Sequence, residues 1–100
     1  MSGPVPLDSY VSDVLMRDLV GHDRAPSAFL VYLWLWRMSR GEGRERIGAS
    51  LQTIATQTGL SKSAVQGAVR HLKRRRLIEA SRAGPTSAPV YEVKTPWRRD

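Results

Sequence analysis

The sequence predicts a mainly helical α+β fold, with about four helices and a small sheet of two or three strands. Apolar residues recur at helical spacing through the first forty residues. Two short helical patterns then meet at a tight turn between residues 51 and 75, and two alternating segments follow at 77–81 and 90–94. A hydrophobic fraction of 41% and a length of 100 residues suit one domain with a single core.

We expect the domain to span residues 7–97, between a flexible tail at 1–6 and a basic tail at 98–100. The chain has no cysteine, which excludes disulfides and cysteine-bound zinc. Its longest apolar run, from Ala28 to Trp36, is far shorter than the roughly 20 residues that cross a membrane. The first ten residues lack the pattern of a secretory signal, so we expect a cytoplasmic, nucleoid-associated protein.

The first helix is predicted over residues 7–20, where apolar side chains recur every three or four positions. They are Leu7, Val11, Val14, Leu15 and Leu19. Residues 21–24, Gly-His-Asp-Arg, predict a turn after this helix.

The second helix is predicted from Pro26, which suits a first helical position, to about Ser39, with Gly41 and Gly43 ending it. It is apolar around its whole circumference, which predicts burial on all sides. One face should pack on the later helices, and the other on the first helix or on a second subunit. Core packing explains most of this pattern, and a homodimer through the N-terminal helices is the hypothesis for the remainder.

The segment LQTIATQTGLSKSAVQGAVR predicts two helices joined by a turn. Ser50 is a good N-cap for a helix over residues 51–58, and Gly59 can end it in the left-handed conformation. Ser61 caps the second helix, which is expected to reach about Arg75.

Strands are predicted at 46–49, 77–81 and 90–94, the last two forming a hairpin around the turn-rich segment 82–89. In the last strand, Val90 and Glu92 share one face, and Tyr91 and Val93 share the other.

From Pro26 to Trp97 this order resembles winged helix-turn-helix domains, and SLQTIATQTGLSKSAVQGAVRHLKRRRLI carries the resemblance. It is similar to bacterial transcriptional regulators of the GntR-like and MarR-like groups, and to winged domains of plasmid and phage replication initiators. The resemblance implies that the second motif helix, the recognition helix, enters the DNA major groove and that the hairpin is the wing. Many relatives have glycine where this chain has Arg76, which favours a recognition helix that ends elsewhere or frays.

The charge distribution supports a polyanion as partner. Residues 1–50 carry six basic and six acidic residues, whereas residues 51–100 carry ten basic and three acidic ones. The whole net charge of +7 therefore lies in the half that contains the motif, where it could release counterions from phosphates.

On the recognition helix, Ser63, Gln66 and Arg70 recur on one outward side and are the candidates for reading base edges. Gln66 can pair with adenine and Arg70 with guanine. Gly67 is costly inside a helix, and two explanations carry equal weight. It either allows close backbone approach to DNA, or reflects a close helix–helix contact or plain tolerance.

Phosphate contacts are expected from the basic side chains around this helix and from its N-cap turn. The expected residues are Ser61, Lys62, Lys73, Arg74 and Arg82. The run at 73–76 could instead be solvated and interact with the helix dipole. The tip at 84–89 has no charge, so we expect no base reading there. Lys94, Arg98 and Arg99 follow the hairpin, and Trp97 is interpreted as an anchor rather than a base-stacking platform.

No catalytic constellation, cofactor motif, metal cluster or small-molecule site is evident, so no enzyme activity is expected. His22 and His71 are far apart in the sequence, and His71 stands among basic residues. The leading hypothesis is sequence-specific binding of double-stranded DNA by a bacterial transcriptional regulator. The alternatives are a plasmid or phage replication or partition factor that binds origin DNA, and a winged-helix module that binds proteins; RNA binding also stays open.

Overall fold

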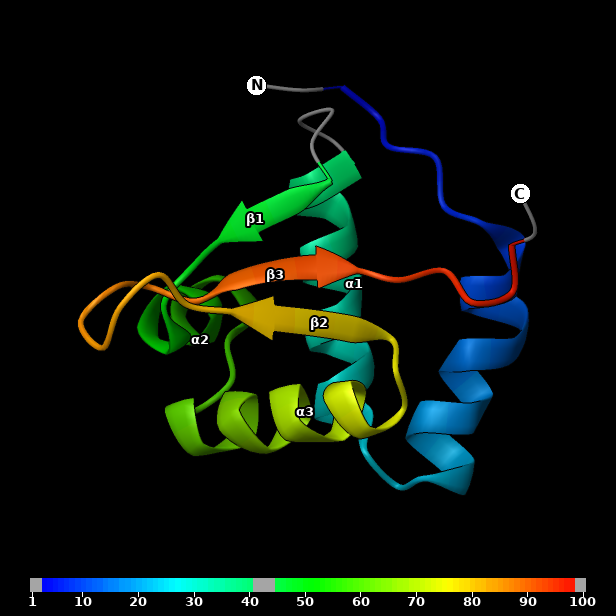
Figure 1. Cartoon of the computed structure of the whole chain (residues 1–100). Helices are drawn as coiled ribbons and strands as arrows, with labels where there is room; N and C mark the ends of the chain where they lie inside the picture. Colours follow the sequence, from blue (N-terminus) through cyan, green and yellow to red (C-terminus); the bar gives the residue numbers. More distant parts are fainter. Residues whose placement is uncertain (1–2, 41–44, 99–100) are drawn as a thin grey trace.

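The structure, a computed structural model, describes residues 3–40 and 45–98. Gly41 and Gly43, expected to end a helix, and Arg99 of the basic tail lie outside the described residues. Figure 1 shows a helical N-terminal segment followed by helices, a short strand and a hairpin. The elements are the π-helical segments η1 (Val11–Leu15) and η2 (Arg17–His22), α1 (Pro26–Arg40), β1 (Arg46–Gly48), α2 (Leu51–Thr58), α3 (Lys62–Arg74), β2 (Ile78–Ser81) and β3 (Val90–Val93).

The segments η1 and η2, together called the N-terminal helix, are wound more widely than an α-helix. The N–H of Asp23 bonds the carbonyl of Asp18, five residues back, at 2.7 Å. The helix continues to His22, so the turn predicted to begin at Gly21 is wrong by two residues. The turn comes at Arg24, whose φ of 53° is left-handed. This winding buries a strict every-fourth-residue stripe of Val11, Leu15 and Leu19, and leaves Val20 exposed. Leu7 precedes the helix, which begins two residues later than predicted.

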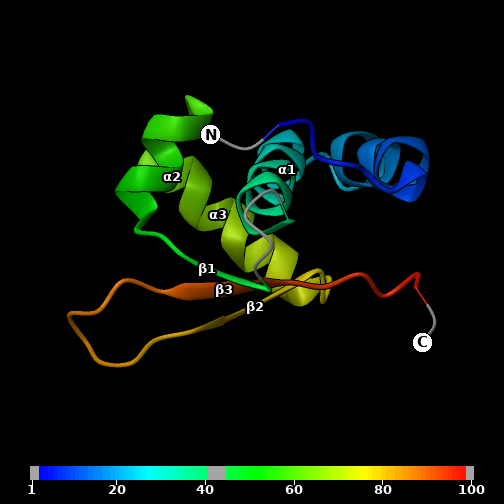
Figure 2. The same cartoon turned by 90° about the horizontal axis from the view of Figure 1, so that it is seen from above.

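Helix α1 is the centre of the helical layer. It lies between α2 and the N-terminal helix and above the sheet (Figure 2). Val31, Tyr32, Leu35 and Trp36 are at most 1% exposed, as the apolar sequence predicts. The expectation of burial on every side is wrong at Leu30, which is 44% exposed.

None of the helices in the described part of the chain is both long and apolar enough to cross a membrane.

Local chemistry sets the bounds of α2 and α3, which agree closely with the prediction. Ser50 Oγ accepts a hydrogen bond from the N–H of Thr53 at 3.0 Å, and Ser61 Oγ accepts one from Ala64 at 3.1 Å. Gly59 ends α2 in the left-handed conformation with a φ of 80°. The two caps and this glycine fix where the second motif helix begins.

The end of α3 corrects the expectation at Arg76. The helix ends at Arg74, and Arg76 itself takes the left-handed conformation with a φ of 58°. The N–H of Leu77 bonds the carbonyl of Leu72, and that of Arg76 bonds Lys73, both at 3.0 Å. This is the Schellman arrangement, completed by the buried side chains of Leu72 and Leu77. The two backbone bonds and the burial of both leucines hold an arginine in a conformation that usually selects glycine.

The sheet is antiparallel in the order β1-β3-β2 and packs one face on the helices. Tyr91 and Val93 of β3 are buried, as the alternation predicts. The Tyr32 hydroxyl of α1 donates to the carbonyl of Lys94 at 2.8 Å, which ties the hairpin to the central helix. On the other face, Glu79 and Glu92 stand directly opposite each other.

Both end segments of the described chain meet beside α1. The Arg98 guanidinium donates to both carboxylate oxygens of Asp8, at 2.6 and 2.7 Å, and Trp97 Nε1 donates to the same carboxylate at 2.9 Å. These donors, Arg98 foremost, hold the pKa of Asp8 below its ordinary value. Trp97 stacks on Tyr10 with ring centroids 4.7 Å apart and lies 6.3 Å from Trp36. Trp97 is therefore an anchor in an aromatic cluster.

We expect Arg76→Gly to stabilise the fold by about 0.5–1 kcal/mol, because glycine removes the left-handed strain at some cost in unfolded-chain entropy. Urea unfolding measures the change. Gly59→Ala is the matched control and should destabilise by about 1 kcal/mol, because a Cβ there meets no atom within 4 Å and only the backbone is strained. A loss of stability in Arg76→Gly would contradict the assigned helix end.

Candidate nucleic-acid interface

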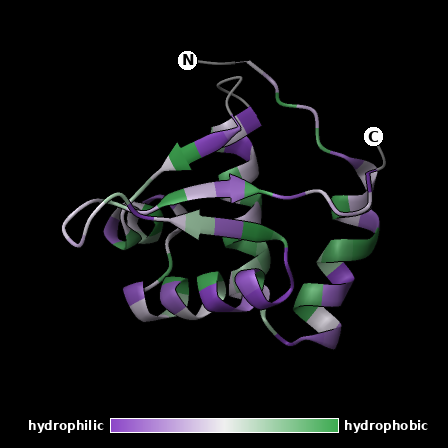
Figure 3. Cartoon of the chain, in the orientation of Figure 1, coloured by the Kyte–Doolittle hydropathy of each residue, from purple (hydrophilic) through white to green (hydrophobic). Residues whose placement is uncertain are grey.

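The face of α3 that points away from the core carries the predicted base-reading residues. Val65, Ala68 and Leu72 are buried, and Ser63, Gln66 and Arg70 are exposed on the opposite side. The exposed three follow one another at intervals of three and four residues, so they form one row along the helix. Hydrophilic and hydrophobic residues alternate along α3 in Figure 3. The structure thus brings the predicted readers together on one accessible surface.

A line of basic side chains runs along the side of α3 that faces the sheet. Lys62 and Arg82 line one groove of about 320 Å³, between the start of α2 and the loop of the hairpin. Lys73 and Arg82 line a second groove, between α3 and the strands, and Lys73 and Arg76 a third. Three of the predicted phosphate contacts, Lys62, Lys73 and Arg82, therefore flank the row of Ser63, Gln66 and Arg70 on this side.

The opposite flank of the row contains Gly67 and Arg74. Arg74 is exposed, and its guanidinium donates to His71 Nδ1 at 3.2 Å. A Cβ built on Gly67 would meet only the Arg70 guanidinium, at 4.0 Å. No neighbouring helix requires glycine here, which removes the helix–helix contact from the explanations of Gly67. Close approach of a ligand and plain tolerance are left.

The hydroxyls at the start of α3 are already engaged. Ser61 Oγ caps the helix, and its distance to Ser63 Oγ is 3.2 Å. Either hydroxyl can donate in this pair. Ser63 therefore reaches the exposed face with its hydroxyl oriented by the capping residue. Because the Ser61 hydroxyl is engaged in capping, the phosphate contact predicted at Ser61 is left to the backbone N–H groups of this turn.

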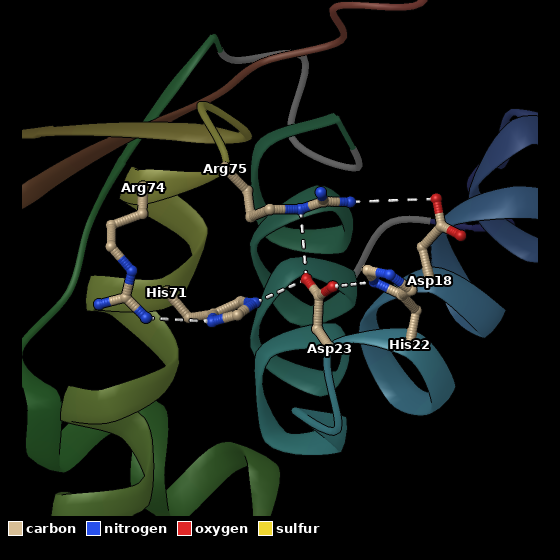
Figure 4. A network of polar contacts seen from close by, with 6 residues as sticks. All are labelled: Asp18, His22, Asp23, His71, Arg74 and Arg75. Atoms are coloured by element: carbon tan, nitrogen blue, oxygen red, sulfur yellow. Dashed lines mark hydrogen bonds and ion pairs between the residues drawn. The ribbon is translucent and has the colours of Figure 1, made fainter.

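The C-terminal turn of α3 joins the N-terminal helix through a polar network centred on Asp23 (Figure 4). The side chain of Asp23 is only 8% exposed. Its carboxylate contacts His71 Nε2 at 2.7 Å, His22 Nδ1 at 2.9 Å and Arg75 Nε at 3.2 Å. Hydrogen bonds from His22 and His71, together with the charge of Arg75, hold the pKa of Asp23 below its usual range.

The sequence interpretation missed this network. It placed His71 among basic residues only, whereas the structure brings His22 and His71 to one carboxylate. Arg75 pairs with Asp23 and lies 3.9 Å from an oxygen of Asp18. The nearness of His71 to Arg75, one helical turn apart, is visible in the sequence. Asp23 stands 48 positions away from His71, so no local pattern could identify it as the partner.

Lys94 and Arg98, the basic residues that follow the hairpin within the described part of the chain, are engaged within the protein. Lys94 Nζ lies 3.3 Å from Glu92 and 3.6 Å from Glu79, and it offsets the repulsion between these opposed carboxylates. Its hydrogen bond with Glu92 is the main reason that the pKa of Lys94 is raised. Arg98 is paired with Asp8 on the far side of α1. Arg82 differs in that no carboxylate of the described residues pairs with it; its guanidinium donates to the carbonyl of Pro85 in the same loop, at 3.4 Å.

The described residues contain no group of three His, Asp or Glu side chains placed to hold a metal ion. The carboxylate of Asp23 stands between two imidazoles and an arginine, an arrangement of hydrogen-bond donors around one acceptor. This cluster therefore presents N–H donors and positive charge around a single carboxylate.

Comparison with known proteins identifies the part of the chain that contains α2 and α3. A family model described as a helix-turn-helix domain matches residues 25–78. The match covers α1, β1, α2 and α3 and ends at the first residue of β2, so the N-terminal helix and most of the hairpin lie outside it. Comparisons with curated proteins and with solved structures give no match.

We expect Asp23→Asn to lower the free energy of unfolding at pH 7 by roughly 1–3 kcal/mol, because charge-assisted hydrogen bonds are lost. The lowered pKa of Asp23 means that its contribution is present at neutral pH and is lost as the pH falls through the folded-state pKa. The difference between the two proteins in urea unfolding should therefore shrink toward acid. Asp13→Asn, at an exposed carboxylate, is the control. A difference that grew toward acid would contradict the assignment.

Proposed function

The chain belongs to the helix-turn-helix domain family, and on that premise we propose that it binds double-stranded DNA in a sequence-specific manner, with α3 in the major groove. Family membership implies DNA as the partner. The choice of duplex, the groove and the specificity are our proposal. The observation that carries it is the row of Ser63, Gln66 and Arg70, exposed on α3 and flanked by basic residues on both sides.

We assign base reading to the central row. Arg70 presents a planar fork of N–H donors that matches guanine O6 and N7, and Gln66 offers the donor and acceptor that adenine requires. Ser63 reaches the same surface one turn earlier. Because major-groove edges differ for every base pair, three polar side chains in a row can discriminate sequences rather than merely bind DNA.

We assign phosphate binding to the two flanks. Lys62, Lys73 and Arg82 border grooves on the sheet side, and Arg74 lies on the other side. A major groove is bordered by two phosphate backbones, so basic residues on both sides of a reading helix fit its cross-section. The backbone N–H groups at the Ser61 turn add donors near the helix N-terminus. These contacts supply affinity without sequence preference.

We propose a bacterial transcriptional regulator as the biological role. A replication or partition factor that binds origin DNA would use the same surface, and its genomic sites would be repeats at an origin. A protein-interaction module would need an acidic or apolar face on α3. The exposed residues of that face are polar or basic, which favours nucleic acid over protein.

A homodimer through the N-terminal helices is proposed as the working assembly. Large apolar side chains on or just before the N-terminal helix and on α1 are exposed: Leu7, Tyr10, Met16, Val20 and Leu30 are each at least 37% accessible. A second copy that covered part of this surface would bring a second recognition helix into the assembly. Sedimentation at working concentrations measures the subunit count.

The proposal is tested by selection from a random duplex library at two salt concentrations. We expect a recovered motif that survives the higher salt, because base contacts do not depend on counterion release. A palindromic motif would indicate two copies. Binding that collapses in salt without any motif would reject sequence-specific recognition.

Substitutions at two arginines separate the assigned roles. We expect Arg70→Ala to cost roughly 1–3 kcal/mol in binding and to relax preference at one base pair. Arg74→Ala should weaken all sequences alike and lower the salt slope by about one unit. Binding titrations with the selected site and with single-base variants measure both. The assignment fails if Arg74→Ala changes preference and Arg70→Ala does not.

The close-approach explanation of Gly67 is tested by Gly67→Leu. Open space at this position means that leucine should fold normally and gain helix propensity of about 1 kcal/mol. If the backbone at Gly67 lies against the duplex, the same substitution should abolish specific binding. Unchanged affinity would leave plain tolerance as the explanation.

A further inference from the structure

We propose that Asp23 and His71 are positioning residues that hold Arg74 ready for a DNA phosphate. This inference rests on the proposed function of α3. Its basis is a continuous chain of contacts, from Asp23 to His71 Nε2 at 2.7 Å, and from His71 Nδ1 to the Arg74 guanidinium at 3.2 Å. Figure 4 shows the imidazole of His71 between the carboxylate and the guanidinium.

The partners fix the tautomer of His71. A guanidinium only donates hydrogen bonds, so His71 Nδ1 must accept from Arg74 and carry no proton. The ring proton is then on Nε2, from which it is donated to the carboxylate of Asp23. A neutral imidazole in this tautomer connects an acceptor at one end to a donor at the other, and neither contact survives in the opposite tautomer.

The carboxylate at the start of this chain is itself fixed. Asp23 is 8% exposed, and its backbone N–H bonds the carbonyl of Asp18 at the end of the N-terminal helix. Arg75 Nε contacts the same carboxylate at 3.2 Å. The guanidinium of Arg75 is therefore directed toward Asp23 rather than toward the outward face that carries Arg74. The N-terminal helix therefore acts on the proposed interface without being part of it.

Restraining the side chain of Arg74 in the free protein reduces the conformational entropy that it loses when DNA binds. A free arginine loses side-chain conformational entropy when it engages a phosphate. Arg74 is already restrained by His71 on the flank where Gly67 leaves open space. The acceptor on His71 satisfies one guanidinium N–H and leaves the others for a phosphate oxygen.

A double-substitution cycle tests this coupling through DNA affinity. We expect His71→Leu and Arg74→Ala each to weaken binding of the selected duplex by about tenfold, the scale of one charge-assisted contact. The double variant should bind no worse than Arg74→Ala alone, because His71 acts through Arg74. His71→Leu combined with Arg82→Ala is the control, and there the two losses should multiply. Multiplying losses for His71 with Arg74, or unchanged affinity in His71→Leu, would overturn the proposal.

His71→Gln distinguishes positioning from a purely structural role. A glutamine amide can accept from Arg74 through its oxygen and donate to Asp23 through its nitrogen. We expect this variant to keep DNA affinity within about twofold of the unsubstituted chain, since both contacts are retained. A tenfold loss of DNA affinity in a stably folded His71→Gln would count against the proposed chain of contacts from Asp23 through His71 to Arg74.

The ring nitrogen chemical shifts of His71 test this chain of contacts without DNA. At neutral pH, the free protein should show protonated Nε2 and unprotonated Nδ1. Protonation at Nδ1 would overturn the proposal. If the unsubstituted chain bound no DNA at all, the proposed function would fail, and these shifts would still decide whether the contact chain exists.

Discussion

The rest of the structure depends on the need to cover α1. Val31, Tyr32, Leu35 and Trp36 form one broad face that spans about 140° of this helix, and each is almost completely buried. No single element can cover so broad a face, so the motif helices, the N-terminal helix and β3 all pack on α1. Their positions around α1 leave the outer side of α3 exposed, which is why that side can be polar. The surface proposed to meet DNA is thus a consequence of how one apolar helix is enclosed.

The positive charge of the second half of the chain is divided among distinct tasks. Arg75, Lys94 and Arg98 are paired with carboxylates, and they hold elements together. Lys62, Lys73 and Arg82 line grooves beside α3, and Arg70 projects from its centre. Composition alone cannot separate these groups, because pairing depends on which carboxylates the fold brings near. The network at Asp23 further divides two consecutive arginines: Arg75 is paired with the carboxylate, and Arg74 is bonded to His71 at the surface.

What could be predicted from the sequence is what neighbouring residues determine. The bounds of α2 and α3 follow from capping at Ser50 and Ser61 and from the glycine at 59, all of which act within one turn. The exposed row of Ser63, Gln66 and Arg70 on α3 follows from helical spacing in the same way. Partners far apart in the sequence could not be predicted, as Asp23 with His71 and Asp8 with Arg98 demonstrate. The same limit applies to the wide winding of the N-terminal helix and to Arg76, whose left-handed backbone depends on the packing of Leu72 and Leu77.

The contact between Asp8 and Arg98 makes the chain almost a closed ring, joined without a covalent bond. The elements between these two segments would keep their packing if a linker joined the segments and retained the bond from Trp36 Nε1 to the carbonyl of Pro6. A circularly permuted chain could open in the uncharged part of the hairpin loop, at residues 84–88, and keep α1 enclosed as before. Two ends placed there would emerge beside the groove lined by Lys62 and Arg82, and would offer a point for attaching a label next to the surface proposed to meet DNA.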